Sequence, residues 1–165
     1  MPEKPMPRPR DLVVRAADRA RLQEQSFRHP LNPASEIHGY MLGRAVGLKR
    51  VGVSLIRLPP GKESFVQHVH YTEEEWMYVL SGTGVALLGD EQLEIGPGDF
   101  LGFPPATLPH LTRNAGAVDL VYLSGGESVH VEIADFPREG KRLVRTGTEA
   151  TVYPLGAGTP LLPKG

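Results

Sequence analysis

Short apolar runs that end in glycine or proline dominate the chain from residue 51 onward. The first run, residues 51–58, stops at the turn sequence Pro59-Pro60-Gly61. Runs of this length predict strands, because an amphipathic helix needs a longer stretch with apolar residues three or four positions apart. Strands are expected at residues 51–58, 76–80, 85–88, 93–95, 100–103, 110–113, 120–123 and 129–133, the last alternating apolar residues with His130 and Glu132. Many short strands at this spacing are typical of a β-sandwich or a β-barrel.

Turn-forming residues lie between these runs. Gly89-Asp90 separates two apolar runs and predicts a tight hairpin. The segment 29–33 contains two prolines and an asparagine, which predict a loop. The chain of 165 residues has 19 glycines and 16 prolines, too many for a helical bundle. An all-β fold in one domain is therefore expected.

The segments before and after the strands have weaker patterns. Four prolines among the first nine residues predict an extended arm over residues 1–10. Residues 12–14 fit an edge strand, and residues 16–25 permit one short helix. The tail from residue 146 is expected to be irregular. We divide the chain into the arm, an N-terminal extension (11–50) that packs on the barrel, the barrel itself (51–135) and a C-terminal extension (136–165).

Composition excludes several functional classes. The 18 basic and 19 acidic residues give a net charge of −1, so no overall field favours nucleic acid or an anionic membrane as a partner. The absence of cysteine excludes disulfides, thiolate zinc sites and cysteine nucleophiles, which leaves histidine and carboxylates as metal ligands. The N-terminus lacks the apolar stretch of a signal peptide, and no apolar run approaches the roughly 20 residues of a spanning helix. A cytoplasmic protein is expected.

Two histidines stand two residues apart, at positions 68 and 70. In a strand such positions share a face, so both imidazoles can converge on one ion. An acidic turn follows and leads into the strand 76–80. If Glu75 faces inward, Met77 and Val79 do too, whereas an inward Glu74 brings larger aromatic residues inside. Alternation leaves both glutamates open. His110 comes after a proline-rich turn, and alone it would be read as a core or surface residue.

Together these two segments resemble the paired motifs of the cupin superfamily. The first motif is matched, with one extra residue before the first histidine, by Gly61, His68, His70, Glu75 and Gly82. The second is matched, with Ala106 where glycine is usual and one residue added before the histidine, by Gly98, Pro104, His110 and Asn114. The resemblance covers roughly residues 50–124, and its register singles out Glu75 over Glu74.

The resemblance implies a single jelly-roll barrel, or double-stranded β-helix, that holds one divalent metal ion. Its ligands would be His68, His70, Glu75 and His110. Such nitrogen and oxygen ligands suit Fe, Mn, Zn or Ni, and an octahedral ion would keep two positions open for a substrate. A metal-dependent enzyme on a small organic molecule is therefore expected, of the oxygenase, isomerase or lyase type. The alternative is a non-catalytic sensor that binds a small molecule or sugar.

Other residues have weaker assignments. Phe65, Met77 and Tyr122 either line a cavity or are plain core. Asn114 either orients a ligand or forms a turn, and Arg57 either meets an anionic substrate or faces solvent. A sugar-phosphate isomerase would need a basic anion pocket, and the sequence identifies none. Three histidines are expected not to be ligands: His29, His38 and His130. The resemblance also implies a homodimer, because cupin barrels tend to pair through their outer sheet.

Overall fold

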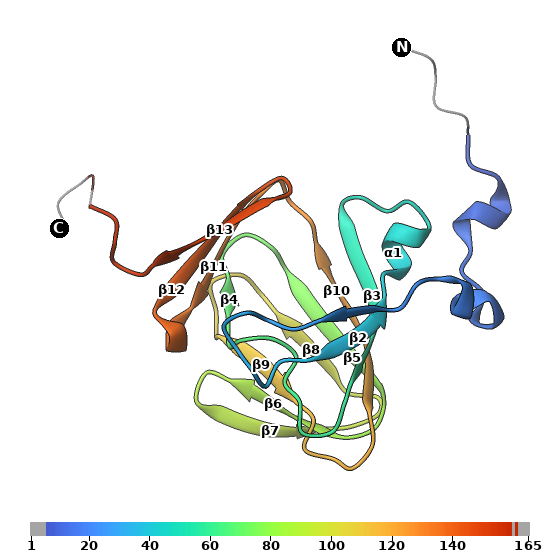
Figure 1. Ribbon diagram of the computed structural model, residues 1–165, viewed down its shortest axis with the longest axis horizontal. Helices are drawn as coiled ribbons and strands as arrows, with labels where there is room; N and C mark the ends of the chain where they lie inside the picture. Colours follow the sequence, from blue (N-terminus) through green and yellow to red (C-terminus); the bar gives the residue numbers. More distant parts are fainter. Residues whose placement is uncertain (1–5, 160, 162–165) are drawn as a thin grey trace.

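The computed structural model describes residues 6–159 and residue 161 and is built almost entirely of antiparallel strands (Figure 1). Its largest sheet has the order β1-β2-β3-β10-β5-β8. These strands are β1 (Gln25–Phe27), β2 (Ile37–Tyr40), β3 (Val51–Leu58), β10 (Leu120–Glu127), β5 (Glu75–Ser81) and β8 (Phe100–Phe103). The prediction of an all-β jelly-roll barrel is confirmed.

Two smaller sheets complete the barrel. The three-stranded sheet has the order β7-β6-β9 and consists of β7 (Glu91–Ile95), β6 (Gly84–Leu88) and β9 (His110–Arg113). The four-stranded sheet has the order β13-β12-β11-β4 and consists of β13 (Glu149–Pro154), β12 (Lys141–Thr146), β11 (Val131–Phe136) and β4 (Val69–His70). The predicted tight hairpin at Gly89-Asp90 is confirmed, since Leu88 pairs with Glu91 and Gly89 has a φ of 59°.

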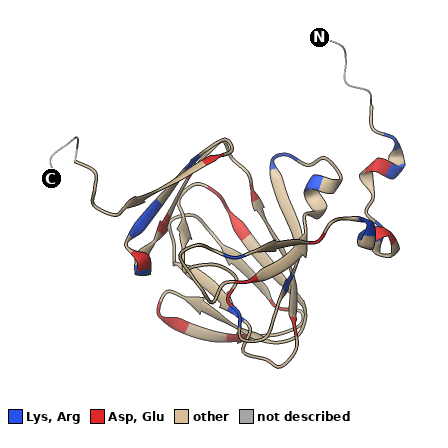
Figure 2. Cartoon of the chain, viewed as in Figure 1, with Lys and Arg blue, Asp and Glu red and all other residues tan. Residues whose placement is uncertain are grey.

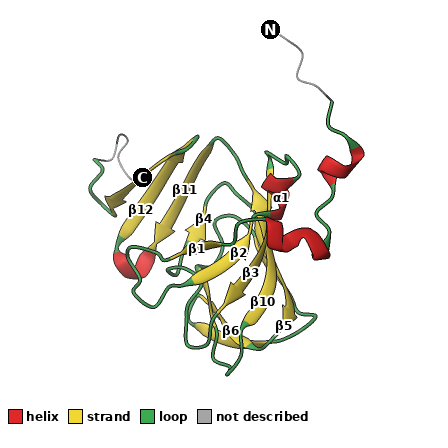
Figure 3. Cartoon of the chain, turned by 45° about the vertical axis from the view of Figure 1, so that its right-hand side comes forward, coloured by secondary structure: helices red, strands yellow, loops and turns green. Residues whose placement is uncertain are grey.

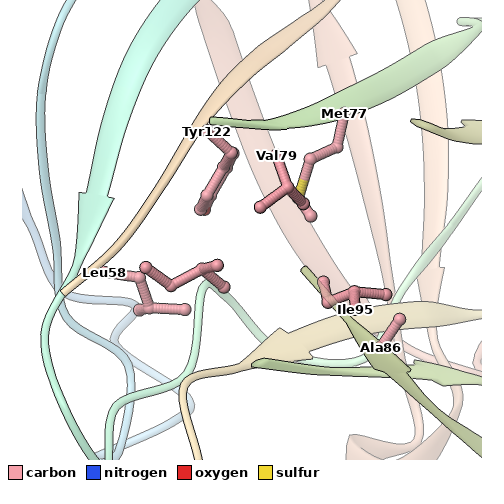
Figure 4. Packing of buried hydrophobic residues seen from close by; sticks show 7 residues of the cluster. Leu58, Met77, Val79, Ala86, Ile95 and Tyr122 are labelled. Atoms are coloured by element: carbon pink, nitrogen blue, oxygen red, sulfur yellow. The ribbon is translucent and has the colours of Figure 1, made fainter. Parts of the chain in front are cut away.

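The main core lies between the six-stranded and three-stranded sheets (Figure 4). It consists of Leu58, Met77, Val79, Ala86, Ile95, Leu120 and Tyr122. Along β5, Met77 and Val79 are buried while Tyr78 and Leu80 are exposed, so alternation sets the inward face of this strand. Each fully buried aliphatic side chain contributes about 1.5–3 kcal/mol. Glu75 begins the same inward row and is thereby turned into the barrel.

The N-terminal segment differs from its prediction. Residues 12–14 form no strand, and short helical turns occur instead at η1 (Pro9–Leu12) and η2 (Ala16–Arg21), both 3-10 helices. The first turn is favoured by Pro9 at its start and by Asp11, whose carboxylate accepts hydrogen bonds from the backbone and guanidinium of Arg8. Residues 1–5 of the expected arm lie outside the described part. Figure 3 shows these helices and α1 (Leu42–Ala45) beside the barrel.

The prediction of an irregular C-terminal tail is wrong. Strands β12 and β13 form a hairpin in which Thr146 pairs with Glu149. Gly147, with a φ of 61°, supplies the left-handed conformation that this two-residue turn requires. The hairpin pairs with β11 and extends the sheet that carries β4. Strand β13 is exposed along its whole length, so no buried apolar run marks it in the sequence.

Charged residues of both signs are distributed over strands and turns (Figure 2). Within the described residues, no helix has the length and apolar character needed to cross a membrane.

The homodimer stays a prediction, and the outer face of the six-stranded sheet is the surface that it would use. Phe100 is 65% exposed there, stacked on Trp76, and Tyr78 and Leu80 are exposed beside it. Exposed apolar patches of this kind mark surfaces that contact a protein partner. Sedimentation velocity should give a dimer for the wild type and a monomer for Phe100→Glu. A monomeric wild type would contradict the prediction.

Candidate metal centre

Backbone pairing brings the two motif segments together. The His68 N–H donates to the His110 carbonyl (3.1 Å), and the His110 N–H donates to the His68 carbonyl (2.8 Å). His70 lies one step further along, in β4, and Glu75 opens β5. Metal-ligating atoms of all four residues lie within 4.8 Å of one another. The structure therefore gathers the four residues that the motif register selected.

The three imidazoles converge on one carboxylate oxygen. Glu75 Oε2 lies 3.1 Å from His110 Nε2, 3.2 Å from His70 Nε2 and 3.7 Å from His68 Nε2. Three neutral imidazoles and one carboxylate are a donor set that fits a divalent first-row transition ion. Glu74 is outside this cluster; it is exposed, and its N–H donates to the Glu127 carboxylate. The choice between the two glutamates thus falls on Glu75.

The protonation states of Glu75 and His110 suit metal binding at neutral pH. Burial raises the pKa of Glu75, but hydrogen bonds from His110, His68 and His70 outweigh it, so the pKa lies well below the usual value. Burial lowers the pKa of His110, which keeps this ring neutral. Burial also acts to lower the pKa of His70, yet Glu75 and Glu132 together raise it. An anionic Glu75 and a neutral His110 are the forms that bind a metal.

Each ligand ring has a different partner behind it. His68 Nδ1 donates to the Val66 carbonyl at 2.9 Å, and His70 Nδ1 donates to Glu132 Oε1 at 3.1 Å. These bonds leave both Nε2 atoms free to face the centre. His110 Nδ1 is buried without a hydrogen-bond partner among the described residues. Its ring is instead fixed by stacking on Phe103, with centroids 3.8 Å apart and planes within 4°.

Glu132 is a functional residue that sequence reasoning missed. Alternation with apolar neighbours would place it outside, but it is only 2% exposed, while Val131 is exposed. Besides His70, its carboxylate accepts hydrogen bonds from the N–H groups of Tyr71 and Glu73 and from the Thr72 hydroxyl. Glu132 therefore fixes the whole turn that joins β4 to β5. No local sequence signal marks it, because it lies 62 positions after His70, the ligand candidate that it contacts.

Ala106, at the place where the motif usually has glycine, adopts a backbone conformation that favours glycine. Its φ is 55°, in the left-handed region that disfavours residues with a Cβ, and its N–H donates to the His70 carbonyl at 2.7 Å. The turn is thus part of the site, and the alanine stores strain in it.

Contacts in the structure decide the roles of the other residues for which the sequence left two readings open. Phe65, Met77 and Tyr122 line a cavity of about 460 Å³ that opens beside the four ligands. Asn114 forms a turn, since its amide donates to the Leu58 and Val118 carbonyls and its oxygen accepts from the Gly116 N–H. Arg57 lies outside the cavity and pairs with Asp119 and Glu24.

Three histidines lie outside the four-residue cluster, as expected. His29 is buried against Phe65, with ring centroids 4.2 Å apart. His38 bonds to Ser26 and Glu36, and His130 is exposed.

Comparison with known proteins identifies the family. The family model described as the cupin domain matches residues 54–126 of this chain. A crystal structure from Acidithiobacillus ferrooxidans, named as a candidate sugar phosphate isomerase, is 37% identical with a TM-score of 0.89, covering 93% of this chain and 99% of that one. The chain belongs to the cupin superfamily.

Two further relatives are similar to this cupin. A sugar phosphate isomerase of the cupin superfamily from Silicibacter pomeroyi is 25% identical with a TM-score of 0.74, covering 86% of this chain and 90% of that one. An uncharacterized protein from Methanocaldococcus jannaschii is 41% identical over 66 residues, which are 40% of this chain. This cupin matches 51% of the length of that protein.

Glu132→Gln should weaken metal affinity about 10–100-fold, because the amide no longer offers His70 a charged acceptor. Competition with a chromogenic chelator measures the affinity. The matched control is Asp135→Asn on the same strand, since this buried carboxylate bonds to Tyr71 and Arg142 and to no ligand. An equal loss of affinity in both variants would show that Glu132 acts only through stability.

Ala106→Gly should raise the free energy of unfolding by about 0.5–1 kcal/mol, because glycine adopts a positive φ without strain. Urea unfolding monitored by circular dichroism measures it. A destabilised variant would contradict the strained turn.

Proposed function

We propose that this cupin is a metal-dependent enzyme that acts on a small organic molecule inside the barrel. The observation that carries the proposal is the position of the ligand cluster, which lies in the wall of a 460 Å³ cavity. A cavity of this size is typical of sites for small molecules. His68, His70, Glu75 and His110 would hold the ion at the edge of the space where a substrate fits.

The bound metal would act as a Lewis acid that polarises a carbonyl or hydroxyl oxygen of the substrate. The chain's own residues would bind the substrate and orient the metal ligands. Phe65, Phe103 and Phe136 line the cavity with apolar surface. Ser124 Oγ lies 3.5 Å from Glu75 Oε1 and donates to the oxygen that does not face the histidines. Ser124 is therefore a positioning residue for the carboxylate ligand.

An isomerase or lyase type of reaction is favoured within this proposal. The two similar crystal structures from Acidithiobacillus ferrooxidans and Silicibacter pomeroyi carry the name of an isomerase. An oxygenase remains the other reaction type with the same ligands, and a ligand sensor is the non-catalytic alternative. Fold alone does not separate these, because one fold supports many functions.

The test is turnover by protein stripped of metal and reloaded separately with Fe²⁺, Mn²⁺, Zn²⁺ or Ni²⁺. Incubation with a panel of hydroxy ketones and hydroxy acids, followed by NMR and an oxygen electrode, should show metal-dependent conversion without oxygen uptake. His110→Ala should abolish it, whereas His130→Ala, which changes an exposed histidine outside the cluster, should not. Saturable binding with no conversion under any metal would contradict the proposal and favour a sensor.

A further inference from the structure

The charge and polarity of the cavity restrict what it can bind. We infer that its ligand is an uncharged, largely apolar molecule that reaches the metal through oxygen, and not a phosphorylated sugar. This inference rests on the proposed function, because it takes the cavity beside the four ligands as the substrate site.

Carboxylates dominate the charged groups of the lining. Five glutamates lie there, and Arg145 is the only arginine or lysine among the described lining residues. The glutamates are Glu73, Glu74, Glu75, Glu127 and Glu132. Even a bound divalent ion would leave this lining negative. A phosphate dianion would therefore meet net repulsion instead of the cationic clamp that recognition of phosphate requires.

Arg145 already makes three hydrogen bonds. Its Nη2 donates to Glu73 Oε1 at 2.5 Å, and its Nη1 donates to the Val129 carbonyl at 2.9 Å and to the Gly147 carbonyl at 3.3 Å. These contacts hold the hairpin of β12 and β13 against the turn before β5. The charge of Arg145 is thus already paired with Glu73, and a phosphate would compete with that carboxylate for it.

The uncharged lining offers mostly apolar surface. Ile37, Ile56, Phe65, Phe103, Phe136 and Leu143 contribute to it. The lining has few hydroxyl side chains, and three of them already have contacts. Ser64 Oγ accepts from the Thr112 N–H, the Thr112 hydroxyl contacts Met77, and Ser124 Oγ donates to Glu75. A polyhydroxylated sugar would lose water from several hydroxyls without gaining partners here, which disfavours its binding.

Tyr122 supplies one polar group for a ligand. It is 4% exposed, lines the cavity, and has a hydroxyl with no hydrogen-bond partner among the described residues. Burial, together with the charge of Glu75, raises its pKa, so the phenol keeps its proton and can donate. Few free donors in the cavity suit a ligand with few oxygen atoms and an apolar body.

The experiment compares four probes on Zn²⁺-loaded protein by isothermal titration calorimetry. Benzohydroxamate and acetohydroxamate share an uncharged chelating group and differ only in the apolar body, while fructose 6-phosphate and inorganic phosphate test for an anion site. Benzohydroxamate should bind at least about tenfold tighter than acetohydroxamate, because the ring is buried against apolar walls. Neither phosphate compound should bind saturably.

Two variants locate the binding. Tyr122→Phe should weaken the affinity for benzohydroxamate by about threefold to tenfold, since it removes one hydrogen-bond donor and keeps the aromatic ring. Arg57→Gln, a change outside the cavity, should leave benzohydroxamate binding unchanged. Saturable binding of fructose 6-phosphate that is lost in Arg145→Gln would overturn the inference about the ligand but not the metal-dependent function. Failure of every probe to bind in a metal-dependent way would overturn the proposed function itself.

Discussion

The pairing of the His68 and His110 backbones is the constraint on which the site depends. Two reciprocal hydrogen bonds join segments that lie 42 positions apart in the numbering, and each segment carries a ligand at the point of contact. The alternation of β5 then turns Glu75 toward the same point, because Met77 and Val79 are held in the core. The ligands are therefore placed by the packing of the barrel and not by one another.

A second layer of contacts fixes the direction of each ring. Val66 orients His68, Glu132 orients His70, and the face of Phe103 holds His110. Glu132 also binds the turn that leads from β4 into β5, so one buried carboxylate connects the four-stranded sheet with the six-stranded sheet at the site. This arrangement couples the stability of the barrel mouth to the geometry of the ligands.

The sequence predicted what depends on local patterns. Strands 51–58, 100–103 and 110–113 agree with β3, β8 and β9 at both ends, because apolar runs bounded by glycine or proline define them. The ligands followed from strand geometry and motif register. Glu132 did not, because its burial results from a contact with His70 that no local pattern encodes. Strand β13 was not predicted for a related reason. It is exposed throughout and depends on pairing with β12.

A metal ion held by His68, His70, Glu75 and His110 is the central claim. Elemental analysis of protein purified without added metal, repeated on His68→Ala and His130→Ala, tests it most directly. The account predicts about one transition ion per chain in the wild type and in His130→Ala. It also predicts loss of that ion in His68→Ala, with the circular dichroism spectrum unchanged. Equal metal content in folded His68→Ala would contradict it.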